Sequence, residues 1–222
     1  MTIVAALVVA VALPGAAPQP AVNPCVAPSR PSTAVSLRPV DQAVLQPDFF
    51  TFRARLQAAI AARDEAALLA AVDRDIRLSF GDENGLDELR KQLRAPGGTF
   101  WTELATALAL GGTFTSATSF TAPYVFAAWP ERLDSFECAA VLGERVRVRK
   151  SAAADSAVVG SVSYEIVQVL PVARAGEPVR VRLANGVTGF VAAPFLRGPI
   201  DRRAIFERAG GRWLMRSFVA GD

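Results

Sequence analysis

Hydrophobic and polar residues alternate through much of the stretch from Cys138 to Arg197. A period of two places successive side chains on opposite faces of a β-strand. Asn185-Gly186 separates two of the runs, and this dipeptide favours a β-hairpin because both residues accept positive φ. The strand-like runs lie at 145–149, 158–162, 166–170, 179–183 and 188–191. Short strands separated by turn residues predict a small all-β barrel.

The order and spacing of these runs resemble the bacterial SH3 (SH3b) domain family. The runs that carry the resemblance are Arg145–Arg149, Val158–Val162, Val179–Leu183 and Thr188–Val191. The resemblance covers residues 137–198 and implies an SH3-like barrel that acts as a binding module. Pro178 and Phe190 stand where many relatives carry tryptophan. The aromatic ligand contacts of the family are therefore not carried over to this chain.

Residues 47–136 have a helical period instead. Apolar side chains recur three or four positions apart, which places them on one face of each helix. Asp48 and Asp64 precede the first two helices and can cap their free N–H groups. The expected helices cover 49–60, 65–72, 86–93 and 101–110. The expected strands lie at 76–80, around Phe114 and Phe120, and at 124–126.

Two strand-like runs flank Gly210-Gly211 near the end of the chain, which predicts a β-hairpin. A lone hairpin is marginal in water, so Phe206 and Trp213 need another element to bury them. We expect residues 199–222 to pair with strands of 47–136 and to complete that domain. In the alternative, the hairpin packs on the barrel alone.

The order of elements in the first unit resembles, weakly, the NTF2-like fold, in which helices pack into a curved sheet. Arg63-Asp64 between the first two helices and Gly211-Arg212-Trp213 in the hairpin carry this resemblance. No site is carried over, because enzymes of that family usually place His or Asp in the cone. The expected fold class is an α+β unit, possibly NTF2-like, plus a small all-β SH3-like barrel.

The N-terminal residues from Ile3 to Leu13 form one apolar run that is too short to cross a bilayer as a helix. The small residues of 14–17 follow, a pattern typical of a secretory signal peptide. The alternative is an apolar tail that is disordered or packed in the core. The expected organisation is a signal peptide at 1–21, a proline-rich linker or extended arm at 22–46, an α+β domain at 47–136 completed by 199–222, and a barrel at 137–198.

Cys25 and Cys138 are the two cysteines of the chain. Two cysteines in an oxidising compartment usually pair, so export predicts a disulfide between them. Two free buried thiols are the alternative. A disulfide together with the N-terminal run favours a periplasmic or secreted protein.

The chain has 222 residues, a net charge of +3 and no histidine. The lack of histidine removes the commonest general base and the commonest metal ligand, so we expect neither an enzyme nor a metal or cofactor site. A charge of +3 is compatible with an anionic partner, but it falls short of the footprint of a nucleic-acid binder. We expect no nucleic-acid partner and no transmembrane segment in the mature protein.

The densest group of acidic and amide residues follows the strand expected at 76–80. Its members are Asp82, Glu83, Asn84, Asp87 and Glu88. Part of this run resembles a calcium loop, but Phe80 stands where the first carboxylate ligand belongs. We therefore favour a turn followed by a helix N-terminus, where acidic residues are stabilised by the helix dipole.

Arginines form the candidate binding face of the expected barrel. They are Arg145, Arg147, Arg149, Arg180 and Arg182. Alternation with buried valines is enough to explain them as a solvated sheet face. If their two strands lie in neighbouring positions, the guanidinium groups cluster and can hold carboxylates or phosphates with two hydrogen bonds each.

These features favour a non-catalytic exported envelope protein. Its SH3b module would bind peptidoglycan, another anionic envelope polymer or a periplasmic protein partner. The alternative is an NTF2-like protein that binds or transforms a small molecule and uses the barrel for targeting. The contents of the cone distinguish the two hypotheses, because a ligand site needs converging polar groups in a pocket.

Overall fold

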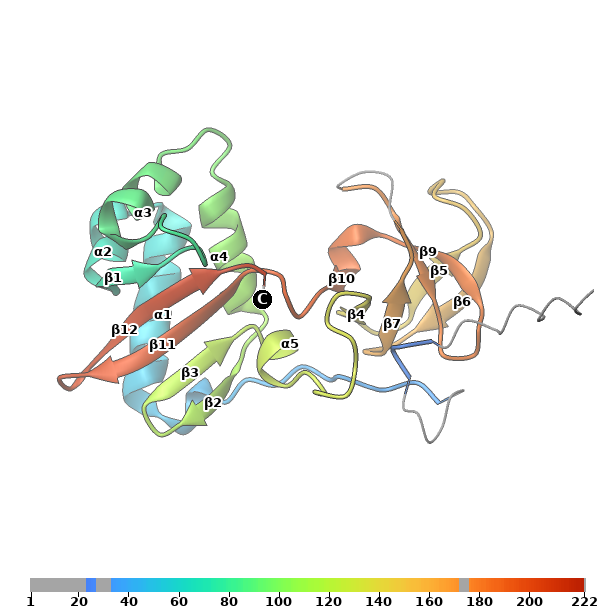
Figure 1. Cartoon of the computed structure of the whole chain (residues 1–222), viewed down its shortest axis with the longest axis horizontal. Helices are drawn as coiled ribbons and strands as arrows, with labels where there is room; N and C mark the ends of the chain where they lie inside the picture. The colour runs from blue at the N-terminus through green and yellow to red at the C-terminus, as the bar shows by residue number, and fades with distance from the viewer. Residues whose placement is uncertain (1–22, 27–32, 172–175, 222) are drawn as a thin grey trace, which may run out of the picture.

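A computed structural model describes residues 23–26, 33–171 and 176–221 of the chain. The structure is mixed α+β and contains a five-stranded and a seven-stranded sheet. Figure 1 shows the five-stranded sheet with its helices beside the seven-stranded sheet. The predicted signal peptide at 1–21 lies outside the described residues. No helix in the described ranges is long and apolar enough to span a membrane.

The α-helices of the described chain lie between residues 47 and 127. They are α1 (Pro47–Ala62), α2 (Glu65–Ala70), α3 (Gly85–Leu93), α4 (Thr99–Ala109) and α5 (Tyr124–Ala127), with short 3₁₀ helices η1 (Ala43–Leu45) and η2 (Ala193–Phe195). Helix α1 begins at Pro47, before the expected N-cap Asp48, because proline suits the first helical position. Asp64 caps α2 as predicted, since its carboxylate accepts a hydrogen bond of 2.9 Å from Ala67 N.

Two of the expected elements are wrong. Val72 was expected to end a helix, but it begins the first strand, which runs from Val72 to Arg77 and leaves Phe80 exposed. Residues 124–126 were expected to be a strand, but they lie in α5. Pro123 has no N–H for a strand ladder, and its carbonyl accepts hydrogen bonds from Phe126 N and Ala127 N instead.

The C-terminal hairpin lies in the middle of the five-stranded sheet. The strands are β1 (Val72–Arg77), β2 (Thr113–Ser116), β3 (Ser119–Ala122), β11 (Arg203–Ala209) and β12 (Arg212–Val219), in the order β1-β12-β11-β3-β2. β12 pairs with β1 in parallel, and β11 pairs with β3 in antiparallel fashion. The hairpin therefore pairs with β1 and β3, two strands that precede Cys138 in the sequence.

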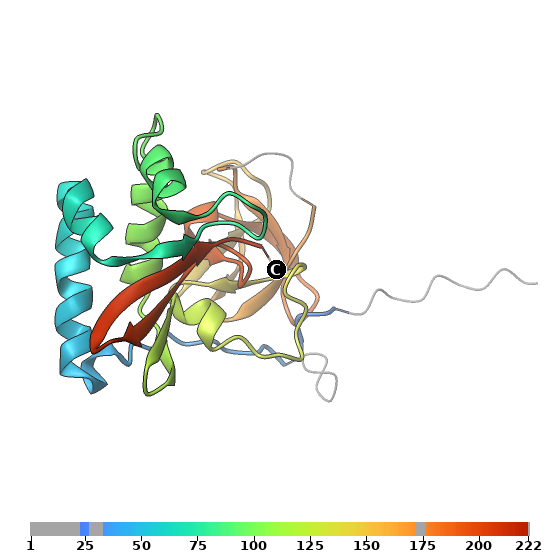
Figure 2. The ribbon, with the colours of Figure 1, turned by 60° about the vertical axis from the view of Figure 1, so that its left-hand side comes forward.

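Helices α1 and α4 cover one face of this sheet, as Figure 2 shows. The core between them is an aromatic cluster around Phe49. Its ring lies 4.3 Å from Phe120, 4.8 Å from Trp213, 5.5 Å from Phe114 and 5.6 Å from Phe206, measured between centroids. Aromatic pairs at such separations contribute about 0.5–1.5 kcal/mol each beyond their buried area. The space between helices and sheet is therefore filled by rings.

The second sheet is built from the valine-rich runs, close to the ranges that the alternation predicted. Its strands are β4 (Cys138–Val141), β5 (Val146–Arg149), β6 (Val158–Val162), β7 (Ile166–Val169), β8 (Val179–Arg182), β9 (Thr188–Val191) and β10 (Leu196–Arg197), in the order β10-β4-β7-β8-β9-β5-β6. Asn185-Gly186 forms the predicted turn, with Gly186 at φ 87°. One face buries Val148, Val181 and Val191 completely.

The seven-stranded sheet is open, whereas a closed barrel was expected. Within the described part of the chain, β6 pairs only with β5, and β10 pairs only with β4. β10 has two residues, which is too short to extend a ladder towards β6. The sheet therefore has two edge strands, β6 and β10.

The segment expected to be a linker is bonded to both sheets. We call residues 33–46 the arm; it runs along the lower side of the molecule in Figure 1. At one end Leu37 N donates to Tyr164 O, and Ile166 N donates to Val35 O. At the other end Gln42 N donates to Gly112 O. The described part of residues 22–46 therefore connects the two sheets through hydrogen bonds.

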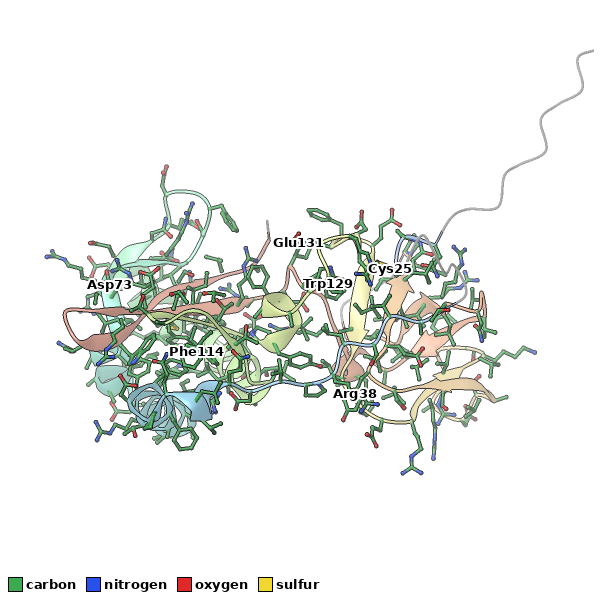
Figure 3. The ribbon with its side chains drawn as sticks, turned by 90° about the horizontal axis from the view of Figure 1, so that it is seen from below. Cys25, Arg38, Asp73, Phe114, Trp129 and Glu131 are labelled. Atoms are coloured by element: carbon green, nitrogen blue, oxygen red, sulfur yellow. A yellow bond between two sulfur atoms is a disulfide. The ribbon has the colours of Figure 1, made fainter. Side chains whose placement is uncertain are left out.

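A small core joins the two sheets near the arm. Its buried members are Cys25, Leu37, Tyr124, Val125, Leu133, Cys138, Ala140 and Ile166. The predicted Cys25–Cys138 disulfide is present, with a Cα–Cα distance of 5.7 Å and a sequence separation of 113 residues. Figure 3 shows Cys25 beside the seven-stranded sheet and Arg38 of the arm between the two sheets. The disulfide fastens the start of the described chain to β4.

An ion pair anchors the arm to α1. Arg53 is buried, and its Nη1 and Nη2 each donate to a carboxylate oxygen of Asp41 at 2.7 Å. Burial alone would raise the pKa of Asp41, but hydrogen bonds from Arg53 and from Ala43 N outweigh it and hold the pKa below its ordinary value of 3.8. Arginine is rarely buried without a partner, and this pair with Asp41 satisfies the guanidinium of Arg53.

Replacing both cysteines with alanine tests the role of the disulfide. A bond that closes a loop across 113 residues should stabilise the fold by about 4–5 kcal/mol, chiefly by restricting the unfolded chain. Urea unfolding of the variant and of the oxidised chain measures the difference. Equal midpoints for the two proteins would contradict this account.

Asp41→Asn tests the anchor of the arm. The variant should lose about 1–2 kcal/mol of stability at neutral pH, because the buried Arg53 loses a charged partner that is itself partly exposed. The folded pKa of Asp41 is lowered, so its contribution is present above the unfolded pKa and is lost as the pH falls through the folded pKa. The difference between variant and original chain should therefore shrink below about pH 4.

The matched control is Asp75→Asn, which removes a highly exposed carboxylate that lies 3.9 Å from Arg74. It should leave the unfolding free energy almost unchanged. If Asp41→Asn is as mild as this control across the pH range, the anchor is not a stabilising contact.

Candidate functional site

A groove with a volume of about 440 Å³ lies along β5 on the seven-stranded sheet. We call it the β5 groove. Arg145, Arg147 and Arg149 line it with their side chains, and Pro178 lies among the apolar residues that line the same space. Three of the five arginines predicted from the sequence thus come together at one hollow.

Alternation along β5 explains why these arginines are outside. Val146 and Val148 are buried in the core of the sheet, with exposed fractions of 6% and 0%. Because neighbouring side chains point to opposite faces, Arg147 and Arg149 point away from that core. Arg145 precedes the strand at a positive φ of 51°, and its backbone N–H donates to Ser163 Oγ at 2.8 Å.

Arg180 reaches the same face from β8. In the register of the sheet, Phe190 on β9 stands opposite both Arg149 on β5 and Arg180 on β8. Directly paired residues project to the same face, so the ring lies between the two arginines. The clustering hypothesis required the two arginine strands, β5 and β8, to be neighbours. They are not neighbours, because β9 lies between them and separates them by about 10 Å.

Arg182 does not join the groove. Its Nη1 donates to Gln168 Oε1 at 2.9 Å, and Gln168 Nε2 donates to Glu137 Oε2 at 3.1 Å. This chain of contacts ends on a carboxylate and occupies the guanidinium. The predicted arginine set is thus divided, and Arg182 acts as a structural contact.

The arginines of this face, of which Arg180 lies beside the groove and does not line it, have few partners. Among the described residues, the guanidinium groups of Arg145, Arg147 and Arg180 form no hydrogen bond or ion pair, while Arg149 Nη1 donates to Ser156 O at 2.6 Å. Glu144 is the one carboxylate among the described lining residues. Such donors can take a carboxylate or phosphate with two parallel hydrogen bonds.

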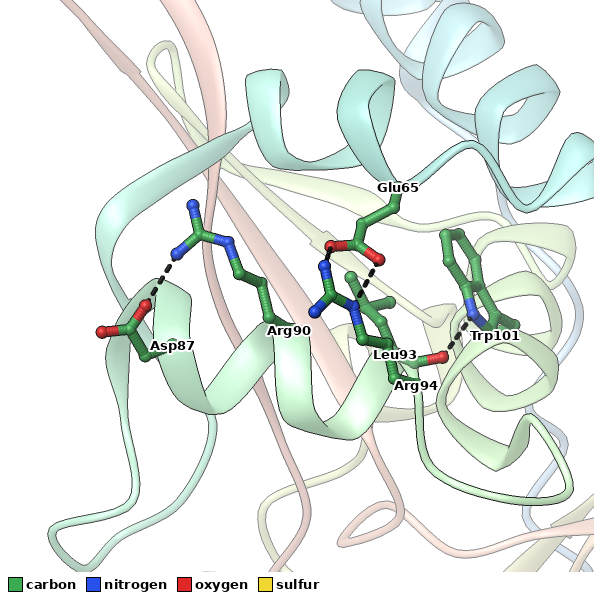
Figure 4. A network of polar contacts seen from close by, with 6 residues as sticks. All are labelled: Glu65, Asp87, Arg90, Leu93, Arg94 and Trp101. Atoms are coloured by element: carbon green, nitrogen blue, oxygen red, sulfur yellow. Dashed lines mark hydrogen bonds and ion pairs between the residues drawn. The ribbon is translucent and has the colours of Figure 1, made fainter.

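Two arginines on the helical side of the molecule, Arg90 and Arg94, are paired, as the network in Figure 4 shows. Arg94 donates to both carboxylate oxygens of Glu65, at 3.0 and 2.7 Å, and Arg90 donates to Asp87 at 2.7 Å. Trp101 completes the network, with its Nε1 donating to Leu93 O. These contacts hold α2, α3 and α4 together and leave little capacity for a ligand.

The acidic run after β1 has a structural explanation. Asn84 Oδ1 accepts hydrogen bonds from Leu78 N and Ser79 N, which shapes the turn. Glu88 pairs with Lys91 one helical turn later. In the described ranges, no group of three His, Cys, Asp or Glu side chains is placed to hold a metal ion.

The sequence did not predict the apolar part of the groove. Phe190 and Phe195 line it, and Phe195 is 47% exposed at the end of η2. A phenylalanine in the turn after β9 is a usable signal, because an isolated exposed ring on a loop has no packing role. The groove combines rings with unpaired cations, which suits a ligand that is both extended and anionic.

Comparison with protein-family models and with curated proteins finds no match to this chain. The function is therefore inferred from the groove and from the residues around it.

Proposed function

We propose that this chain is a non-catalytic exported envelope protein whose β5 groove binds an anionic polymer of the cell wall. Peptidoglycan is the ligand of choice, because its peptide stems carry carboxylates on an extended backbone. A periplasmic protein with an acidic extended segment is the alternative partner. The observation that carries the proposal is the row of arginines beside Phe190 and Phe195, in which Arg145 and Arg147 have no side-chain partner among the described residues.

We assign the groove to an SH3b-like module that covers residues 137–198. Support comes from the order and spacing of its strand runs and from the tight Asn185-Gly186 turn. We assign residues 47–136 and 199–222 to one NTF2-like domain into which this module is inserted. The pairing of β11 with β3 and of β12 with β1 supports that assignment.

Export is part of the proposal. The apolar run from Ile3 to Leu13 supports a signal peptide, and the Cys25–Cys138 disulfide fits an oxidising compartment. A periplasmic or secreted location would place the groove beside cell-wall polymers.

The competing hypothesis was a small-molecule site in the cone between helices and sheet. The aromatic cluster around Phe49 occupies that space, with Phe120 and Phe206 fully buried. No carboxylate lies among the buried described residues there, and the buried guanidinium of Arg53 is paired with Asp41. These contacts favour a structural role for the cone.

Arg147→Ser/Arg180→Ser tests the groove. The double variant should bind purified peptidoglycan about 3-fold to 10-fold more weakly, because two exposed cations each contribute a modest ion pair. Its binding should also depend less on salt, since fewer charges are engaged. Sedimentation with peptidoglycan at several salt concentrations measures both effects.

The matched control is Arg74→Ser/Arg132→Ser, which removes the same charge from exposed positions outside the groove. This control should bind like the original chain. Equal binding by the groove variant and the control would remove the arginine face from the proposal.

A further inference from the structure

A second hollow lies on the opposite unit of the molecule, between α1, α2 and the turn of the β11–β12 hairpin. Its volume is about 510 Å³, within the range of about 300–1,000 Å³ typical of small-molecule sites. We call it the hairpin pocket. It shares no residue with the β5 groove, and it borders the aromatic cluster around Phe49, because Trp213 belongs to both.

The floor of the hairpin pocket is apolar and fixed. It is formed by Phe52, Leu56 and Trp213, of which Leu56 and Trp213 are buried. Trp213 Nε1 donates to Asp48 Oδ2 at 3.1 Å, which sets the orientation of the indole. Because the side chains of the floor are already ordered, covering them with a ligand costs little conformational entropy.

The wall on the side of α2 consists of small residues. Ala67, Ala70 and Ala71 face the floor, and their short side chains leave the hollow open. Ala67 and Ala70 are themselves exposed, so apolar surface lines the pocket on two sides. This surface suits an alkyl chain.

The rim is cationic. Arg55, Arg208 and Arg212 line it, against the single carboxylate of Asp48. Arg208 lies 3.3 Å from Asp48, which leaves an excess of two positive charges. In the described part of the chain Arg55 has no hydrogen bond or ion pair, and the one side-chain contact of Arg212 is a long one, 3.5 Å to Ala70 O.

We propose that the hairpin pocket binds a single-chain anionic amphiphile, an alkyl chain that ends in a carboxylate. The apolar floor and the alanine wall take the chain, while Arg55 and Arg212 take the head group. Guanidinium groups match a carboxylate by charge and by geometry, and those of Arg55 and Arg212 form no ion pair within the described residues. This site is independent of the groove and of polymer binding there.

Titration of the full chain with decanoate, below the concentration at which it forms micelles, tests the proposal. Isothermal titration calorimetry should show saturable binding of decanoate and at least about tenfold weaker binding of decanol, which lacks the charge. Equal affinity for the two probes, or no binding of decanoate, would overturn the proposal.

Two variants locate the site. Ala70→Leu fills the hollow with a good helix former and should abolish decanoate binding, whereas Ala66→Leu on the same helix, outside the pocket, should bind normally. Arg55→Gln/Arg212→Gln should weaken decanoate binding about 3-fold to 10-fold, while Arg74→Gln/Arg132→Gln should not.

Thermal unfolding shows whether each variant is folded. If Ala70→Leu unfolds, the Arg55→Gln/Arg212→Gln variant, which changes surface residues alone, still tests the site. Normal decanoate binding by a folded Ala70→Leu chain, or by the Arg55→Gln/Arg212→Gln chain, would overturn the assignment. The groove variant Arg147→Ser/Arg180→Ser should bind decanoate unchanged, so failure of polymer binding and failure of this site are distinguishable.

Discussion

The C-terminal hairpin supplies two of the three interior strands of the first sheet, and the rest of the structure depends on that pairing. Strand β12 lies between β1 and β11, and β11 lies between β12 and β3. The hairpin also buries Phe206, Met215 and Phe218 completely, and each such side chain contributes about 1.5–3 kcal/mol. In the described chain, β1 and β3 do not pair with each other. These strands therefore form one sheet over the helices only when β11 and β12 have paired between them.

Because of this return, the residues of the seven-stranded sheet lie, along the sequence, between two parts of the five-stranded sheet. The small core between the two sheets, the arm and the Cys25–Cys138 disulfide hold the seven-stranded sheet to the rest of the chain. The arm contributes backbone hydrogen bonds to both sheets, and the Asp41–Arg53 pair fixes one end of it on α1. The β5 groove and the hairpin pocket therefore lie on separate units that the same short segments connect.

Much of the fold was predictable because its signals are local. Alternation of valine and arginine located β5 and β8, and it placed Arg147 outside a buried valine core. Contacts between distant segments were not predictable in the same way. Arg53 and Arg182 look like surface residues in the sequence, but their partners Asp41 and Gln168 come from segments that the pattern does not connect to them. The strand between the two arginine strands and the apolar side of the groove likewise depend on tertiary pairing.

Hydrogen exchange on a chain truncated after Gly198 tests the central role of the hairpin most directly. The truncated chain lacks β11 and β12. This account predicts that amides of α1 and α4 lose their protection, because the sheet that covers them has lost two of its three interior strands. Protection of these helices equal to that in the full chain would show that the first unit folds without the hairpin, and it would contradict the account.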